Sequence, residues 1–223
     1  MNTQVPGNPV EKNRSDFSPL TVITALMVTS YLTANIMAVK MIGFFDIALL
    51  DAGTITFPLA YLLGDILTEL WGFKTARKVI FLTFACNILL VGFTAIGVLL
   101  TSPDYLQANA DAYNTVFTYV PRIVIASLIA FLIGELTNSY LMVKIKALTA
   151  GKYLWMRTIG SSAVGYILDT VIFCIIAFAG IVTTRDLFIM IGAQYVVKLV
   201  IEAVCGTPLA YAIIALLRKK FGY

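Results

Sequence analysis

Six long apolar stretches dominate this sequence, and each is long enough to cross a lipid bilayer as an α-helix. A transmembrane helix needs about 20 mostly apolar residues. The stretches run roughly over residues 20–39, 54–72, 79–101, 121–144, 158–181 and 187–217. Hydrophobic residues make up 60% of the chain, charged residues 13%, and the mean hydropathy is +0.90, which leaves too little polar surface for a water-soluble domain. We therefore predict an all-α integral membrane protein with six transmembrane helices.

One membrane domain, residues 18–217, accounts for nearly all of the chain. Residues 1–17 are polar and predict a disordered cytoplasmic tail, whereas residues 218–223 form a short basic tail. Ser18, followed by a proline, is a helix-start signal, because a serine caps free backbone N–H groups and proline suits the first helical position. Near the other end, Pro208 predicts a kink in the sixth span or the end of its membrane part.

The charges between the apolar stretches predict the orientation of the chain. Cytoplasmic loops of membrane proteins are enriched in lysine and arginine. Alternate connections, together with the tails, hold twelve basic residues: Lys12, Arg14, Lys74, Arg77, Lys78, Lys144, Lys146, Lys152, Arg157, Arg218, Lys219 and Lys220. The opposite connections hold only Lys40 and Arg185, beside five aspartates. We therefore expect a multi-pass protein of the cytoplasmic (inner) membrane with both termini in the cytoplasm.

Several classes of function lack their sequence signatures here. The chain has no histidine, which is the commonest general base and metal ligand. The spacing of its three cysteines fits neither a zinc site nor a disulfide framework. Neither the phosphate-binding G-x-x-x-x-G-K-[ST] loop nor the H-E-x-x-H or G-x-S-x-G motif occurs. We therefore expect neither an enzyme nor a cofactor or metal, and no ATP hydrolysis by the chain itself.

Charged residues within the spans mark the candidate functional region. A charge at the bilayer centre costs roughly 2.5–3.5 kcal/mol, so such residues usually face the bundle interior and mark pathways. Acids outnumber bases in this set, which comprises Asp65, Glu69, Glu135, Asp169 and Glu202 against Arg122 and Lys198. The missing positive charge must come from protonation, from a bound cation or from a ligand rich in hydrogen-bond donors.

Helical spacing groups several of these residues into one site near the midplane. Gln194, Lys198 and Glu202 are spaced i, i+4, i+8 and share one face of the sixth span. Glu135 and Asn138 share a face of the fourth span. The predicted substrate-binding set is Asn35, Glu135, Asn138, Asp169, Gln194, Lys198 and Glu202.

Two ion-pair partners remain open for Lys198. Asp169 lies at a similar depth in the fifth span and is one candidate partner, whereas Glu202 lies one turn further along the same helix.

Arg122 near the outer interface is typical of a snorkelling side chain. Aromatic residues that are candidates for stacking on a planar ligand are Tyr31, Phe57, Tyr61, Phe131, Tyr166, Phe173 and Tyr195.

A second group of charges lies near the cytoplasmic end of the second span. Asp65 and Glu69 directly precede a glycine turn and the basic residues Arg77 and Lys78. Acid, turn and base in this order indicate a charge clip between two helix ends. We interpret Asp65, Glu69, Arg77 and Lys78 as a cytoplasmic latch, with direct substrate contact as the alternative.

The segment from residue 57 to residue 78 resembles the signature of the queuosine precursor transporter family, also called the vitamin uptake transporter family. Its most specific part is the run D-x-x-T-E-x-W-G-x-K-x-A-R from Asp65 to Arg77, in which Trp71 stands where tyrosine is more usual. Further similarity covers residues 33–36 with Lys40, 121–123, 134–139, 157–169 and the positions Gln194, Lys198, Glu202 and Pro208.

The resemblance implies uptake of a 7-deazaguanine precursor of queuosine, such as 7-cyano-7-deazaguanine or 7-aminomethyl-7-deazaguanine. It also implies a six-helix bundle related to the substrate-binding components of energy-coupling-factor transporters. The expected partners are then a small planar purine-like substrate and the lipid bilayer, with a homodimer left open and no nucleic acid.

Three mechanisms compete within these bounds. The first is a carrier, and the second is a substrate-binding component that depends on a separate ATPase module. Such components use a small-residue spacing at a partner surface, which Ala34 and Ala38 reproduce near the outer end of the first span. The third is a membrane enzyme that uses buried carboxylates, against which the lack of histidine and of a nucleophile–base pair counts.

Overall fold

A computed structural model of the protein describes residues 18–44, 47–118 and 120–221. The predicted disordered tail, residues 1–17, and the last two residues of the basic tail lie outside these ranges. Five described helical segments are long and apolar enough to cross a membrane: Pro19–Met37, Gly53–Leu99, Asp104–Leu148, Leu154–Phe178 and Thr184–Lys220. An all-α multi-pass membrane protein is thereby confirmed, while the count of six spans stays a prediction.

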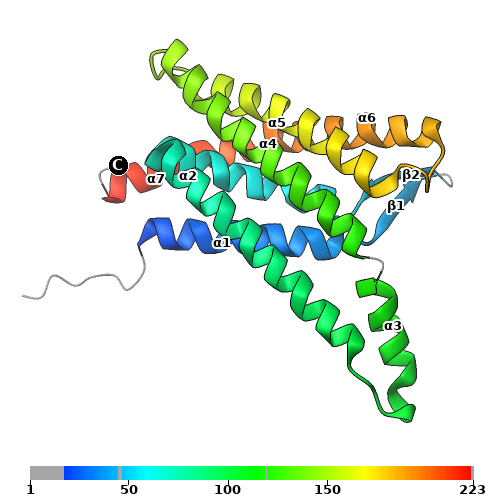
Figure 1. Cartoon of the computed structure of the whole chain (residues 1–223). Helices are drawn as coiled ribbons and strands as arrows, with labels where there is room; N and C mark the ends of the chain where they lie inside the picture. Colours follow the sequence, from blue (N-terminus) through cyan, green and yellow to red (C-terminus); the bar gives the residue numbers. More distant parts are fainter. Residues whose placement is uncertain (1–17, 45–46, 119, 222–223) are drawn as a thin grey trace, which may run out of the picture.

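The long helices form one bundle, in which residues far apart in sequence lie side by side (Figure 1). They are α1 (Pro19–Met37), α2 (Gly53–Leu99), α4 (Val120–Leu148), α5 (Leu154–Phe178), α6 (Thr184–Ile201) and α7 (Thr207–Phe221). Ser18 caps α1 as expected, since its Oγ accepts the N–H of Thr21 at 3.2 Å. The hydrophobic core lies between α1, the first half of α2, α4 and α5, with α7 completing it.

Helix α2 changes direction at Gly72. This residue has φ 78° and ψ 167° inside an otherwise helical stretch of 47 residues, a conformation open to glycine because it has no Cβ. The sequence predicted a loop at residues 73–78, and that prediction is wrong, because the chain resumes its helix at once. Figure 1 shows the two limbs at an angle, with the second limb leading out of the bundle.

Two connections carry secondary structure that the apolar pattern did not indicate. Strands β1 (Met41–Phe44) and β2 (Ile47–Asp51) pair antiparallel between α1 and α2, and β2 packs against α6. A short 3-10 turn, η1 (Asp104–Leu106), and α3 (Gln107–Thr118) connect α2 to α4. Figure 1 shows both connections towards the right of the view, the strands beside the bundle and α3 below it, and we call this end of the bundle the hairpin end.

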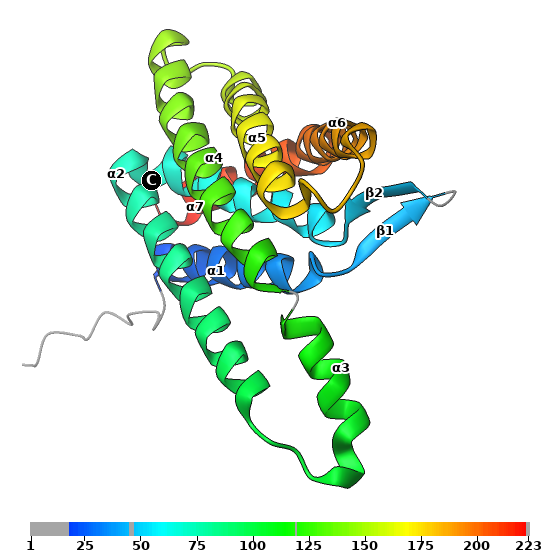
Figure 2. The same ribbon diagram turned by 45° about the vertical axis from the view of Figure 1, so that its right-hand side comes forward.

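Helices α4 and α5 lie against each other at two glycines (Figure 2). A Cβ on Gly134 would lie 3.0 Å from the carbonyl oxygen of Gly165, and a Cβ on Gly165 would lie 3.1 Å from that of Gly134. Small residues let membrane helices approach closely. Tyr61, from α2, packs into the same crossing, because a Cβ on Gly134 would clash with its hydroxyl and a Cβ on Gly165 would lie 3.2 Å from a carbon of its ring.

The polypeptide leaves regular α-helix between α6 and α7. Residues Glu202–Gly206 form a π-helical turn, η2, directly before Thr207 and Pro208. Proline has no N–H to donate to the preceding turn, which accounts for the disturbed hydrogen-bond pattern. Because Glu202 is the first residue of this turn, the irregular backbone lies at a predicted site residue, where π-turns are often found.

Candidate substrate-binding site

The seven residues predicted to bind substrate are all buried in the centre of the bundle. None is more than 2% exposed. They come from α1, α4, α5, α6 and η2, and they are Asn35, Glu135, Asn138, Asp169, Gln194, Lys198 and Glu202. In a membrane protein such side chains must find partners inside the bundle or in a ligand.

Lys198 pairs with Asp169 of the neighbouring helix. Its Nζ donates to Asp169 Oδ2 at 2.7 Å and to Thr170 Oγ1 at 3.1 Å. It also lies 5.3 Å from the centroid of the Phe57 ring. Of the two partners that the sequence left open, the structure therefore selects Asp169. Glu202, the other candidate, accepts the hydroxyl of Tyr166 instead.

Asp65 belongs to this central site in the structure. Its side chain is fully buried, and its Oδ1 accepts a hydrogen bond from Asn138 Nδ2 at 2.8 Å. The sequence placed it in the latch beside Glu69. The structure separates the two acids, because one helical turn, about 5.4 Å, puts Asp65 deeper in the bundle, where α4 supplies its partner.

Glu135 and Glu202 complete a group of three carboxylates. Glu202 Oε2 accepts the hydroxyl of Tyr166 at 3.1 Å, and Glu135 packs against Gly64, where a Cβ would clash with its Oε1. Asp65, Glu135 and Glu202 are close enough for their charges to interact. We call these three residues the acidic triad.

Several oxygens of the acidic triad have no hydrogen-bond partner among the residues that the structure describes. They are Asp65 Oδ2, Glu202 Oε1 and both carboxylate oxygens of Glu135. Buried polar groups are nearly always hydrogen-bonded in proteins. Unpartnered acceptors inside the bundle are therefore typical of a ligand site and unfavourable as mere packing.

A band of aromatic rings in tilted and edge-on contact lies beside the acidic triad. Tyr31 and Phe131 have ring centroids 3.9 Å apart, Tyr61 and Tyr166 are 4.5 Å apart, and Tyr61 and Phe131 are 6.4 Å apart. All four rings are fully buried. The structure thus joins most of the predicted stacking residues into one band.

Phe57 extends this band, since its ring meets Tyr31 edge-on at 5.7 Å. Phe173 does not belong to it and packs against Phe178 in a separate cluster. Tyr195 is only partly buried at the edge of the main core.

Amides supply the remaining polar groups of the site. Asn35 Oδ1 accepts from the Ser127 hydroxyl, and the Tyr31 hydroxyl donates to the Ser127 carbonyl oxygen at 3.0 Å. The Nδ2 of Asn35 and both polar atoms of Gln194 have no partner among the described residues. Ser127 was not predicted, because a lone serine in an apolar stretch carries no signal of its own.

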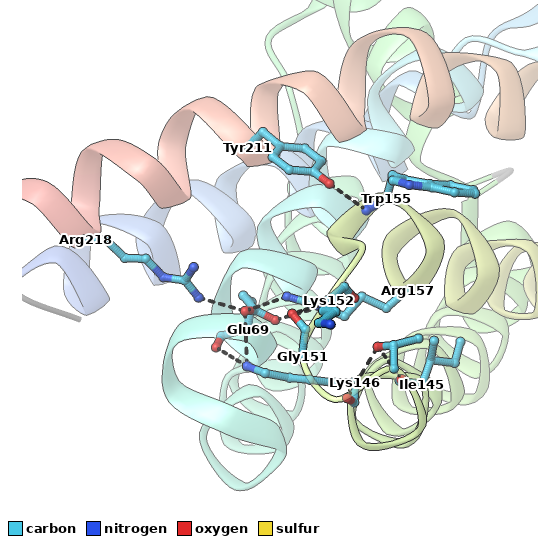
Figure 3. Close-up of polar contacts among 10 residues, drawn as sticks. Glu69, Ile145, Lys146, Gly151, Lys152, Trp155, Arg157, Tyr211 and Arg218 are labelled. Carbon is cyan, nitrogen blue, oxygen red and sulfur yellow. Dashed lines mark hydrogen bonds and ion pairs between the residues drawn. The ribbon is translucent and has the colours of Figure 1, made fainter.

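Of the residues predicted to form a latch, Glu69 has ion-pair partners that the sequence did not predict. Glu69 Oε1 lies 3.1 Å from Lys146 Nζ, 2.9 Å from Arg157 Nη2 and 2.8 Å from Arg218 Nη2. Arg157 also donates from Nε to Oε2 at 3.1 Å. Figure 3 shows the three cations converging on the one carboxylate from α4, α5 and α7. We call Glu69 with these three residues the Glu69 cluster.

Arg77 and Lys78 lie outside this cluster. Both are exposed, and the Arg77 guanidinium lies 5.9 Å from the centroid of the Phe73 ring. In the part of the chain that the structure describes, neither forms an ion pair with Asp65 or Glu69. The change of direction at Gly72 is the physical reason, because it turns residues 73–78 away from the face that carries Glu69.

Arg122 has a structural role. Its Nε donates to the carbonyl oxygen of Ile176 at 2.7 Å and its Nη2 to that of Ala179 at 2.6 Å. These are carbonyls at the end of α5 that no helical N–H satisfies. Its side chain is exposed at the hairpin end, so it caps a helix there and lies apart from the acidic triad.

Comparison with known proteins places the chain in a family. Residues 51–213 match the family described as "Putative vitamin uptake transporter". A "Probable queuosine precursor transporter" of Bacillus subtilis is 30% identical over 180 residues, which cover 80% of this chain and 77% of the relative. A protein of the same name from Haemophilus influenzae is 30% identical over 126 residues, covering 56% of this chain and 51% of the relative.

No solved structure matches the chain, so the predicted kinship with energy-coupling-factor components stays a prediction. The family match and the Bacillus subtilis relative each extend over most of the sequence. They agree with the long apolar helices and with the polar site between them. The chain is therefore a membrane transporter, not an enzyme, and belongs to the vitamin uptake transporter family that includes the queuosine precursor transporters.

Proposed function

We propose that this chain imports a 7-deazaguanine precursor of queuosine, 7-cyano-7-deazaguanine or 7-aminomethyl-7-deazaguanine, across the cytoplasmic membrane. The names of two relatives support this class of cargo. The observation that carries the proposal is Glu135, a fully buried carboxylate with two free oxygens beside the aromatic band. A deazaguanine presents a ring N–H and an exocyclic amine side by side, and a carboxylate accepts both.

The surrounding groups suit the rest of such a ligand. Its planar face matches the stacked rings of Tyr61 and Tyr166, since aromatic stacking favours offset or tilted planes. The Nδ2 of Asn35 and both polar atoms of Gln194, which have no partner among the described residues, offer donors and an acceptor for the ring edge. The Lys198–Asp169 pair holds α5 and α6 together beside the ligand.

The Glu69 cluster serves in this proposal as the latch on the cytoplasmic side. The basic loops orient this end of the bundle towards the cytoplasm under the positive-inside rule. Alternating access needs the helices to separate on one side of the site at a time. Because the cluster ties α2 to α4, α5 and α7 through one carboxylate, opening the inner side requires Glu69 to release them. Arg77 and Lys78 contribute to orientation and not to the latch.

Direct binding and uptake test the proposal. We expect purified wild-type protein to bind a deazaguanine precursor, and liposomes containing it to take the compound up. Glu135→Gln is expected to weaken binding by about tenfold or more, because a charge-assisted hydrogen-bond pair becomes a neutral one. Glu202→Gln is expected to weaken it less.

Asp104→Asn is the matched control, since it removes an exposed acid of η1 at the hairpin end and should leave binding unchanged. Unchanged affinity and uptake in both glutamine variants would remove Glu135 and Glu202 from the site. Absence of binding to any deazaguanine would overturn the proposed cargo.

The alternative, a substrate-binding component that depends on a separate ATPase module, is disfavoured by one contact. The small residues that resemble a partner surface, Ala34 and Ala38, are fully buried. They pack against Gly53, where an added Cβ would lie 3.0 Å from Ala38 Cβ. Uptake by the purified chain alone would reject this alternative, whereas binding without uptake would favour it. The proposal needs no homodimer, because every residue of the site belongs to one chain.

A further inference from the structure

The acidic triad lacks positive charge, and this lack bears on which ligand fits. Asp65, Glu135 and Glu202 form no ion pair within the described ranges. The one lysine of the central site, Lys198, is bound to Asp169. Several carboxylates buried together without a cation are unfavourable unless something positive or proton-bearing joins them. Protonation, a bound cation and a ligand were all left open by the sequence as sources of this charge, and unpartnered acceptors inside a transporter favour the ligand.

The three carboxylates differ in how many oxygens are free. Among the described residues, Glu135 has two oxygens without a partner, whereas Asp65 and Glu202 each have one, because Asn138 and Tyr166 occupy the others. Two free oxygens on one carboxylate fit two donors held side by side in a plane. A single free oxygen on each of two carboxylates fits a compact donor with several N–H groups, such as an ammonium.

Electrostatics points to the same division. Glu202 lies close enough to Asp65 for the two negative charges to repel each other. A cation between the two acids would replace this repulsion by two attractions. Aromatic rings also suit a nearby cation, and Lys198 near the Phe57 ring already shows such an arrangement in this core.

We infer that this transporter selects a deazaguanine that carries a primary ammonium at position 7, with Asp65 Oδ2 and Glu202 Oε1 binding the ammonium and Glu135 binding the planar edge. The inference rests on the proposed function and names the ligand within it. The aminomethyl precursor supplies three N–H donors and a positive charge at that position. The cyano precursor supplies only an acceptor there, which faces carboxylate oxygens without a hydrogen bond.

Equilibrium binding of three ligands to the purified full chain tests the inference. They are 7-aminomethyl-7-deazaguanine, 7-methyl-7-deazaguanine and 7-cyano-7-deazaguanine, which share the planar edge and differ at the substituent. We expect the aminomethyl ligand to bind about tenfold or more tightly than the methyl ligand, and the cyano ligand to bind most weakly. This comparison uses the wild-type protein and needs no variant to fold.

Variants then separate the two parts of the site. Asp65→Asn and Glu202→Gln should reduce the preference for the aminomethyl ligand over the methyl ligand by several-fold and leave the methyl ligand nearly unaffected. Glu135→Gln should weaken all three ligands by a similar factor. Asp104→Asn should change neither affinity nor preference, and elution as a single species on size exclusion checks that each variant is folded.

The outcomes distinguish the two proposals. Equal or tighter binding of the cyano ligand, or an unchanged preference in both Asp65→Asn and Glu202→Gln, would overturn the inference and leave the proposed function standing. Failure of all three ligands to bind would overturn the proposed function, and the inference with it.

Discussion

Asp65 and Glu69 lie one helical turn apart on α2, yet their surroundings are opposite. Glu69 accepts contacts from three cations, whereas Asp65 and the rest of the acidic triad have none among the described residues. The first acid is fully compensated within the chain and holds four helices together. The second group leaves its acceptors free in the bundle centre. The difference separates a residue that stabilises the fold from the residues that we propose to bind the ligand.

The largest expected effect is the loss of stability in Glu69→Gln. The buried guanidinium of Arg157 would then keep its charge without a carboxylate partner, and breaking a buried pair in this way costs about 3 kcal/mol or more. Denaturant titration of the purified protein in detergent measures the free energy of unfolding. Arg77→Gln, which removes an arginine outside the cluster, is the control and should leave it unchanged. A Glu69→Gln protein as stable as wild type would contradict the role of the cluster.

The Lys198–Asp169 pair tests the cost of leaving a buried charge unpaired at a place independent of the Glu69 cluster. Lys198→Met leaves Asp169 uncompensated and should reduce the free energy of unfolding by about 3 kcal/mol. Adding Asp169→Asn removes the unpaired charge, so the double variant should be more stable than Lys198→Met alone. A double-mutant cycle from the same titrations gives the coupling energy. Strict additivity of the two single changes would mean that the observed 2.7 Å contact contributes nothing.

Glu135→Gln should change the free energy of unfolding in the opposite direction from Glu69→Gln. Replacing an unpaired buried carboxylate by a neutral amide removes a desolvated charge, so the free energy of unfolding should stay equal or rise by about 1 kcal/mol while ligand binding falls. The two glutamine variants measured side by side give the sharpest form of the comparison. A loss in Glu135→Gln as large as that in Glu69→Gln would show that both acids are structural.

The smallest effect is expected at the exposed members of the Glu69 cluster. The side chains of Arg218 and Lys146 are 49% and 39% exposed, so water and salt screen their pairs with Glu69. Arg218→Gln should reduce the free energy of unfolding by less than about 1 kcal/mol. High salt should make the difference in free energy of unfolding between Arg218→Gln and the wild-type protein smaller still. A loss equal to that of Glu69→Gln would mean that Arg218 and not Arg157 dominates the cluster.

The contacts of Glu69 also show which kind of contact the sequence could not predict. Its partners lie 77, 88 and 149 residues further along the chain, and a single sequence carries no signal for contacts at such distances. The nearer Arg77 and Lys78 were the natural candidates, until the glycine turn directed them elsewhere. The same limit applied to Asp65, whose place was decided by Asn138 on another helix.

The sequence alone determined the membrane class, the long apolar helices and the burial of the seven predicted site residues. These follow from local physics, because the bilayer demands apolar length and penalises each charge that faces lipid. Only the tertiary structure decided which charges meet: Lys198 with Asp169, Glu69 with three distant cations, and the acidic triad with no cation within the described chain. Pairing depends on how helices approach one another, and that approach is set by packing across the whole bundle.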